Sequence, residues 1–154
     1  MKSRAHPTRG FTMIELMVTL AVAAVLLTLA APSFTDQLAR RRLEGAATEL
    51  STDLQFTRSL AVSSSASAAL ATNAGGTGYT ITPGPSKTVT LDAQLSVTPN
   101  LTVSYDSLRA MAAASGAMTL SSSKTTGQLR VSVSPMGRVS MCSPSGSLKG
   151  YTAC

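Results

Sequence analysis

An apolar segment near the N-terminus constrains this chain more than any other feature. It covers residues 11–31 and reads FTMIELMVTLAVAAVLLTLAA, 21 residues with Glu15 as the only charged side chain. As a helix it would be about 32 Å long, close to the roughly 30 Å thickness of the hydrocarbon layer of a bilayer. The sequence therefore predicts a helix at 11–31 that is long enough to span a membrane.

The charges on either side of this segment leave its orientation open. Lys2, Arg4 and Arg9 precede it, and basic residues before an apolar segment tend to stay on the cytoplasmic side. Three arginines at 40–42 follow it, within the distance over which the same rule counts charges. A second observation is needed to place the C-terminal part of the chain.

The two cysteines supply that observation. Cys142 and Cys154 lie close together at the C-terminal end, and an even number of cysteines in an exported domain favours a disulfide. Closing a loop of about 13 residues stabilises a fold by roughly 3 kcal/mol in the chain-entropy model. The alternative is a pair of reduced thiols in the cytoplasm. We expect a disulfide, and with it a C-terminal domain outside the cytoplasm.

A cleaved secretory signal peptide is the alternative interpretation of residues 1–31. Small residues at 28–31 would offer a cleavage site after the apolar run. Glu15 argues against it, because an acidic residue at mid-membrane costs about 2.5 to 3.5 kcal/mol, less near the edge, and usually has a partner and a role. We expect the apolar helix to be kept in the mature protein.

The motif Gly10-Phe11-Thr12-Met13-Ile14-Glu15-Leu16 resembles the processing site of type IV prepilins and type II secretion pseudopilins. The resemblance implies that prepilin peptidase cleaves between Gly10 and Phe11, removes the leader 1–10 and methylates the new amine of Phe11. Residues 11–31 would remain as a transmembrane and assembly helix. Within a filament, Glu15 would pair with the N-terminal amine of a neighbouring subunit, an attraction that low dielectric strengthens. The alternative is a Glu15 that only reaches the membrane surface.

A second helical pattern follows Pro32, which lacks an N–H and is expected to kink or interrupt the helix. Over residues 32–63 the spacing of apolar positions predicts an amphipathic helix. Its expected buried face consists of Leu43, Ala47, Leu50, Leu54 and Ala61. The charged residues are expected on the opposite, solvated face, and this set comprises Arg40 to Arg42, Glu44, Glu49, Asp53 and Arg58. We interpret the arginine triplet as part of that face, with Arg40 paired to Glu44 at i, i+4, rather than as a site for DNA or lipid.

Residues 64–154 are predicted to form a small antiparallel β-rich head. Runs with alternating or β-branched residues are expected as strands at 79–82, 88–91, 101–105, 128–133 and 138–142, and they are separated by Pro, Gly, Asn and Ser. Leu108 to Ala117 is rich in alanine and is compatible with a short helix or a loop. The fold class is therefore α+β, a long N-terminal helix whose outer half packs on an antiparallel sheet.

The C-terminal end carries a second resemblance. QLRVSVSPMGRVSMC, followed by GYTAC, is similar to the GspH/FimT group of minor pseudopilins, in which a hairpin ends near a Gly-Arg pair and a cysteine-bounded tail closes the head. This implies a structural subunit of a type IV pilus or a type II secretion filament. Its expected location is the bacterial inner membrane, with a single span and a periplasmic head. Its expected partners are prepilin peptidase and other major and minor pilins or pseudopilins.

The inventory of reactive side chains does not favour an enzyme. His6 is the only histidine and lies in the predicted leader, so no serine–histidine pair would survive processing. Asp92 and Asp106, the only acids after residue 63, are more typical of turns than of a catalytic pair. Two cysteines without histidine do not make a zinc site. We expect no catalytic residues, no metal and no cofactor.

DNA binding for natural transformation is the alternative function. Residues 64–154 contain six basic and two acidic side chains, and a basic surface can attract phosphates. DNA-binding relatives of the FimT group use a Gly-Arg-x-Arg pattern, which here reads Gly137-Arg138-Val139-Ser140, without the second arginine. Arg130, Arg138 and Lys149 are the candidate DNA-binding residues, and a solvated sheet surface is the competing interpretation.

Overall fold

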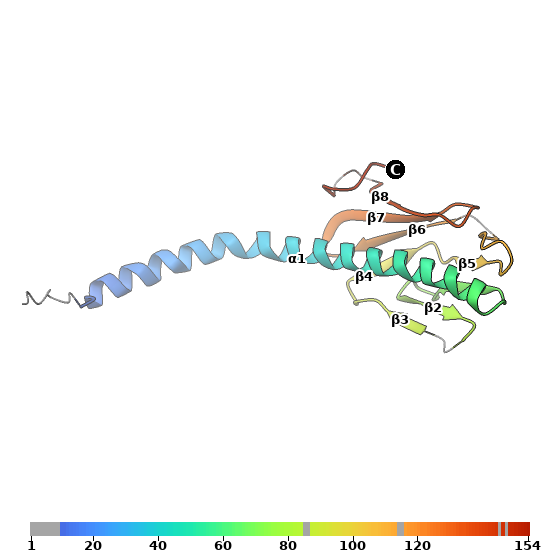
Figure 1. The fold of residues 1–154 in the computed structure, drawn as a ribbon. Helices are drawn as coiled ribbons and strands as arrows, with labels where there is room; N and C mark the ends of the chain where they lie inside the picture. The colour runs from blue at the N-terminus through green and yellow to red at the C-terminus, as the bar shows by residue number, and fades with distance from the viewer. Residues whose placement is uncertain (1–9, 85–86, 114–115, 145, 147) are drawn as a thin grey trace, which may run out of the picture. The chain divides into compact units, whose positions relative to one another are not determined.

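The computed structural model describes residues 10–84, 87–113, 116–144, 146 and 148–154, without the side chains of 29–33 (Figure 1). Contacts divide the chain into two compact units, Met1–Thr35 and Asp36–Cys154. The predicted leader, apart from Gly10, lies outside the described residues.

A single α-helix, α1, extends from Met13 to Ser63. The expected interruption at Pro32 is absent, because the helix is assigned continuously through this position. The expected kink at Pro32 stays a prediction. At its C-terminal end the helix closes with a hydrogen bond from the Ser64 amide to the Leu60 carbonyl (2.9 Å), and Ser65 then takes a positive φ of 52°.

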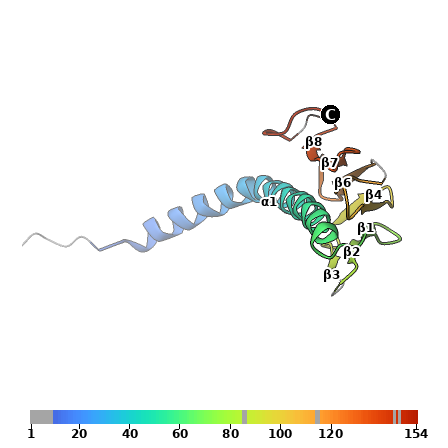
Figure 2. The same ribbon diagram turned by 45° about the vertical axis from the view of Figure 1, so that its right-hand side comes forward.

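The second unit contains two antiparallel four-stranded sheets. The first has the order β3-β2-β1-β5 and the second the order β4-β6-β7-β8. The strands are β1 (Ala68–Thr72), β2 (Gly78–Thr82), β3 (Lys87–Thr90), β4 (Leu95–Thr98), β5 (Thr102–Tyr105), β6 (Gly116–Ser122), β7 (Thr125–Val133) and β8 (Val139–Cys142). Residues 36–63 of α1, called the outer half of the helix below, belong to the second unit. Seen nearly along this outer half, the strands follow an arc from β8 to β3 beside the helix (Figure 2). The amide of Val97 in β4 bonds to the carbonyl of Gly76 (2.9 Å) and so ties the second sheet to the β1–β2 turn of the first.

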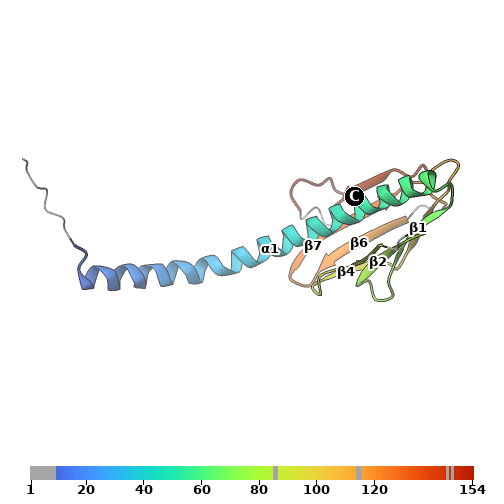
Figure 3. The same ribbon diagram turned by 60° about the horizontal axis from the view of Figure 1, so that its bottom comes forward.

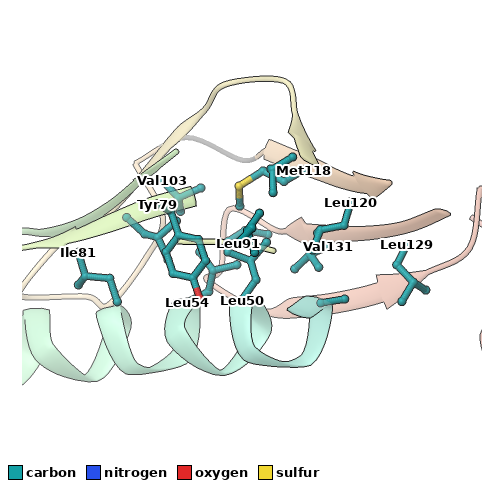
Figure 4. Packing of buried hydrophobic residues seen from close by; sticks show 14 of the residues in the cluster. Leu50, Leu54, Tyr79, Ile81, Leu91, Val103, Met118, Leu120, Leu129 and Val131 are labelled. Atoms are coloured by element: carbon teal, nitrogen blue, oxygen red, sulfur yellow. The ribbon is translucent and has the colours of Figure 1, made fainter. Parts of the chain in front are cut away.

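The outer part of α1 covers both sheets, and the core lies between the helix and the strands (Figures 3 and 4). The expected apolar face of the helix is confirmed, because Leu43, Ala47, Leu50, Leu54 and Ala61 are all fully buried. They meet inward-facing side chains of the strands, which alternate with exposed ones as a half-buried sheet requires. This group comprises Leu70, Tyr79, Ile81, Val97, Val103, Met118, Leu120, Leu129 and Val131. The α+β fold class predicted from the sequence is therefore confirmed.

All five expected strands are present, but three further strands were missed. These are β1, β4 and β6. The segment Leu108 to Ala117 forms no helix where the structure describes it: Ala112 makes an isolated bridge to Tyr105, and Gly116 and Ala117 begin β6. The short-helix interpretation of this segment was wrong. Its alanines favoured a helix locally, whereas pairing with β7 decides the conformation from Gly116 onward.

Candidate assembly and binding surfaces

The predicted cleavage site lies just outside the helix. Gly10, Phe11 and Thr12 are non-helical, and α1 begins at Met13. Gly10 and Phe11 are both exposed, and a Cβ added to Gly10 would meet no atom within 4 Å. A peptide bond between Gly10 and Phe11 is therefore not protected by helical hydrogen bonds, which is the condition that a peptidase needs.

Thr12 caps the start of the helix. Its Oγ1 accepts a hydrogen bond from the Glu15 amide (3.3 Å), and its carbonyl accepts one from the Leu16 amide (3.2 Å). Thr12-Met13-Ile14-Glu15 thus has the spacing of a capping box, a signal that our sequence reading did not use. Glu15 lies in the first turn, where the helix dipole favours a negative charge, and its side chain is exposed. Its carboxylate is therefore available to a group outside this chain.

Phe11 and the inner part of α1, residues 13–28, carry a dense set of exposed apolar side chains. Each of the following is at least half exposed: Phe11, Met13, Ile14, Leu16, Met17, Val18, Leu20, Val22, Val25, Leu26 and Leu27. The hydroxyls of Thr19 and Thr28 donate to the carbonyls of Leu16 and Val25, at 2.9 and 2.7 Å, so they need no outside partner. Soluble monomers rarely leave so large an apolar surface uncovered.

Within the described residues, which leave out the side chains of 29–33, no helix meets the length and hydropathy needed to cross a membrane.

A buried polar cluster joins the outer half of α1 to the first sheet. Asp53 accepts a hydrogen bond from the hydroxyl of Tyr79 (2.8 Å) and pairs with Lys87 Nζ at 2.7 Å. Burial, and then the hydrogen bond to Asp53, raise the pKa of Tyr79 above its ordinary value, so this hydroxyl stays protonated and donates. Our expectation that Asp53 lies on the solvated face was wrong, because position 53 follows Leu50 by three residues and turns toward the sheet.

Two of the three arginines at 40–42 form ordinary ion pairs. Arg40 Nε pairs with Asp36 (2.9 Å), rather than with Glu44 as expected, and Arg42 pairs with Asp92 (2.9 Å). The Asp36–Arg40 pair places the acid N-terminal to the base at i, i+4, which is the more favourable order on a helix. Both pairs are about half exposed, as the interpretation of a solvated face requires.

Arg58 also departs from the solvated face. Its Nε donates to the carbonyl of Ala110 (2.9 Å), in the connection that precedes β6. The side chain therefore bridges the last turns of α1 to a segment 52 residues further along the chain. Burial raises the pKa of the nearby Tyr105 hydroxyl, and the positive charge of Arg58 opposes this rise.

The three candidate DNA-binding residues do not gather at one point. Arg130 is exposed in β7 opposite Cys142, and Arg138 is exposed just before Val139 in the β7–β8 turn. Four residues separate Cys142 from Arg138, or roughly 13 Å at the rise of a strand. Lys149 follows the buried Leu148, whose side chain packs on Gly127 at the opposite end of β7 from Arg138.

The predicted disulfide between Cys142 and Cys154 is confirmed, and it ties the C-terminal residue to β8. Two backbone hydrogen bonds support it: the Ser143 amide donates to the carbonyl of Thr152 (2.9 Å), and the Cys154 amide donates to that of Ser143 (3.4 Å). Leu148, within the segment that the disulfide closes, is 2% exposed, and its side chain packs on Gly127 of β7.

The two late acids serve local structure. Asp92 accepts from the Gln94 amide (3.4 Å) as well as from Arg42, and Asp106 accepts from the Arg109 amide (3.3 Å). Both contacts belong to turns, as expected from the sequence. Among the described residues, no three His, Cys, Asp or Glu side chains lie close enough together to hold a metal ion.

Two known protein families match this chain, each over a different part of it. The prokaryotic N-terminal methylation motif matches residues 6–31, and the type II transport protein GspH family matches residues 46–149, more than half of the chain. No curated protein matches the sequence.

Two solved structures have the same fold, both of the type IV minor pilin FimU of Pseudomonas aeruginosa strain PAO1. The crystal form in space group P21 has a TM-score of 0.55 at 21% identity and covers 66% of this chain and 89% of the FimU chain. The form in space group P65 has a TM-score of 0.50 at 19% identity and covers 64% and 91%.

At this identity the likeness concerns the fold, which is that of a pilin. The family matches add the N-terminal methylation motif and cover the greater part of the second unit. Families of this kind consist of structural subunits rather than enzymes. The chain belongs to the GspH family and is a GspH/FimT-like minor pseudopilin with a pilin fold.

Proposed function

We propose that this protein is a structural subunit of a type IV pilus or type II secretion filament, held in the inner membrane before assembly. The observation that carries the proposal is the segment 11–27, made of Phe11, Thr12 and the first turns of α1, where eleven large apolar side chains are exposed around a single charge, Glu15. Such a helix needs either lipid or the helices of other subunits around it. Membrane storage followed by filament packing supplies both.

Processing by prepilin peptidase fits the geometry at the start of the helix. The Gly10–Phe11 bond precedes the Thr12 cap, so cleavage removes the leader without breaking a helical hydrogen bond. The new amine of Phe11 then lies four residues before Glu15, at the same helix end. Methylation of this amine leaves its positive charge in place.

Glu15 selects the position of a subunit during assembly. Its carboxylate has no partner among the described residues, and in an apolar bundle an unpaired carboxylate is costly. The cationic amine of a neighbouring Phe11 neutralises that charge when the two helices are in register. A subunit in the wrong register leaves both charges unpaired. The pair therefore favours one register of the helices over the others.

The alternative function, DNA capture, receives less support. Phosphate binding gains strength from several cations that neutralise neighbouring phosphates. Here Lys149 lies toward the opposite end of β7 from Arg138, and the second arginine of the Gly-Arg-x-Arg pattern is Ser140. The arrangement of the basic residues therefore favours the structural role.

Replacing Glu15 by Ala tests this mechanism. We expect cleavage and methylation of the Glu15→Ala chain to stay within about twofold of the wild type, because Thr12 still caps the helix. Incorporation into filaments should fall at least about tenfold, the factor that corresponds to 1.4 kcal/mol. Immunoblots of sheared filaments and of membranes measure both quantities.

Glu44→Ala is the matched control, since Glu44 lies on the same helix and its carboxylate makes no hydrogen bond or ion pair with a described residue. It should assemble normally. Wild-type levels of the Glu15→Ala chain in sheared filaments would refute the role of Glu15. Loss of pili or of secretion in a strain lacking the gene identifies which of the two filaments the subunit serves.

A further inference from the structure

A groove lies between the last turns of α1 and the turn that joins β7 to β8. Its volume is about 830 Å³, within the range of sites that enclose a drug-sized ligand. The helix contributes Gln55, Arg58, Ser59, Val62 and Ser63, and the opposite wall consists of Ala110, Met136, Gly137, Arg138 and Val139. All of these residues belong to the second unit.

The walls of the groove are held in place by direct contacts. Arg58 Nε bonds to the Ala110 carbonyl at 2.9 Å. Gly137 has a φ of 75°, and a Cβ at this position would come within 2.8 Å of the same carbonyl and 3.1 Å of Arg58 Nε. The turn is closed by hydrogen bonds from the Gly137 amide to the Ser134 carbonyl (2.8 Å) and from the Arg138 amide to Ser134 Oγ (3.1 Å). The groove therefore exists before anything binds to it.

The chemistry of the groove combines apolar surface with positive charge. Met136 is 72% exposed and Val62 is 52% exposed, and both line the same groove. The guanidinium of Arg138 makes no hydrogen bond or ion pair with any residue that the structure describes. No acid lines the groove. Asp53, two residues before Gln55, is paired with Lys87, and Asp106, four residues before Ala110, accepts from the Arg109 amide. The complementary ligand carries a carboxylate next to an apolar group.

A peptide suits this groove better than a nucleic acid does. Single-stranded DNA is held by rows of cations together with aromatic side chains on which bases stack. The lining contains two arginines, one of them already bonded to Ala110, and it contains no aromatic residue. An Arg–carboxylate pair beside buried apolar surface is instead a common element of protein–protein contacts.

We propose that this groove binds a short extended segment of a neighbouring filament subunit, one that places an Asp or Glu against Arg138 and an apolar side chain against Met136 and Val62. The proposal rests on the proposed function, because that function supplies the neighbour. The groove would then define a contact between heads, separate from the contacts between the N-terminal helices.

Site-specific photocrosslinking in the full-length chain, in its native host, tests the proposal. Met136→p-benzoylphenylalanine places a photoreactive group inside the groove, and Leu108→p-benzoylphenylalanine places it on a side chain that is 91% exposed and outside the lining. We expect irradiation to join position 136, and not 108, to a second protein that carries the N-terminal methylation motif. Mass spectrometry should place that adduct in a segment with an acidic residue.

Two charge reversals make the test specific. Arg138→Glu should lower the yield of the 136 adduct at least about tenfold, the factor expected for loss of a charge-assisted hydrogen bond. Arg130→Glu changes an exposed arginine of the same hairpin outside the groove and should leave the yield unchanged. Adducts with DNA or lipid, equal loss with both reversals, or no adduct from chains that enter filaments would overturn the proposal.

The two proposals fail in distinguishable ways. Failure of the groove leaves a chain that is cleaved, methylated at Phe11 and present in filaments, but lacks the adduct at position 136. Failure of the proposed function leaves a chain without the processed N-terminus or absent from filaments, whatever position 136 reacts with.

Discussion

The carboxylates of Glu15 and Asp53 lie on the same helix but have opposite surroundings. Glu15 is exposed in the first turn of α1, whereas Asp53 is 5% exposed and binds both Tyr79 and Lys87. Asp53 is thus neutralised by groups of its own chain, whereas the Glu15 carboxylate has no partner among the described residues. In the function proposed above, the partner of Glu15 comes from another subunit.

The Asp53 cluster should contribute measurably to the stability of the second unit. Asp53→Ala leaves the buried Tyr79 hydroxyl without its acceptor, which costs about 1 to 3 kcal/mol. Lys87 is 45% exposed and can return its charge to water, so the loss stays below that of a fully buried ion pair. We expect a fall of about 2 kcal/mol in the free energy of unfolding, measured by urea denaturation with circular dichroism.

Asp36→Ala provides the comparison for this experiment. It removes an ion pair on the same helix in which both side chains are more than 40% exposed, and such pairs contribute less than about 1 kcal/mol. Equal effects of the Asp36 and Asp53 substitutions would contradict the role assigned to the buried cluster.

The helical period predicted Leu43, Leu50 and Leu54 as core residues, and the structure confirms them. The same period could not predict that Asp53 is buried, because its partners Tyr79 and Lys87 lie 26 and 34 residues further along the chain. Burial of a carboxylate depends on those distant groups rather than on its own helix. The position of Asp53 at the border of the apolar face was the one signal available.

At the scale of elements, the β7–β8 hairpin does most to shape the candidate surfaces. Its outer face carries Arg130, and its turn forms one wall of the groove. The turn approaches the Ala110 carbonyl so closely that only glycine fits at position 137. In the Gly137-Arg138 pair, the glycine thus allows the close approach of the turn to Ala110, and the arginine supplies the charge.

Gly137→Ala should therefore destabilise the second unit more than strain in φ alone explains. At a φ of 91° Gly75 is also left-handed, but a Cβ there would meet no atom within 4 Å. We expect a loss of about 1 kcal/mol for Gly75→Ala and about 2 to 3 kcal/mol for Gly137→Ala. Thermal or urea unfolding of the two variants measures the difference, and equal losses would show that the close approach has no energetic role.

The strands that the sequence predicted share a feature that two of the three missed strands, β1 and β6, lack at least in part. Tyr79–Thr82 and Gln128–Val133 contain β-branched or aromatic residues in alternation, a pattern that identifies a half-buried strand. In contrast, β1 reads AALAT and β6 begins GAM, with alanine and glycine that have low strand propensity. Pairing with neighbouring strands decides these segments, and such pairing is a long-range effect.

At the scale of the whole molecule, the composition divides between two tasks. The 44% hydrophobic content belongs heavily to residues 11–31, where the apolar side chains described up to residue 28 are exposed, while the strands and the outer helix enclose a modest core of small and aliphatic residues. Likewise the net charge of +6 includes three basic residues in the predicted leader. The chain combines an exposed apolar helical segment with a light, Ser- and Thr-rich head.

The N-terminus of the mature protein tests this account most directly. Mass spectrometry of the protein purified from membranes of its native host measures the first residue and its modification together. We predict a chain that begins at Phe11 with a methylated amine and retains residues 11–31. A mature chain that begins near Pro32 would contradict the account, because the segment proposed to anchor and assemble the subunit would have been discarded.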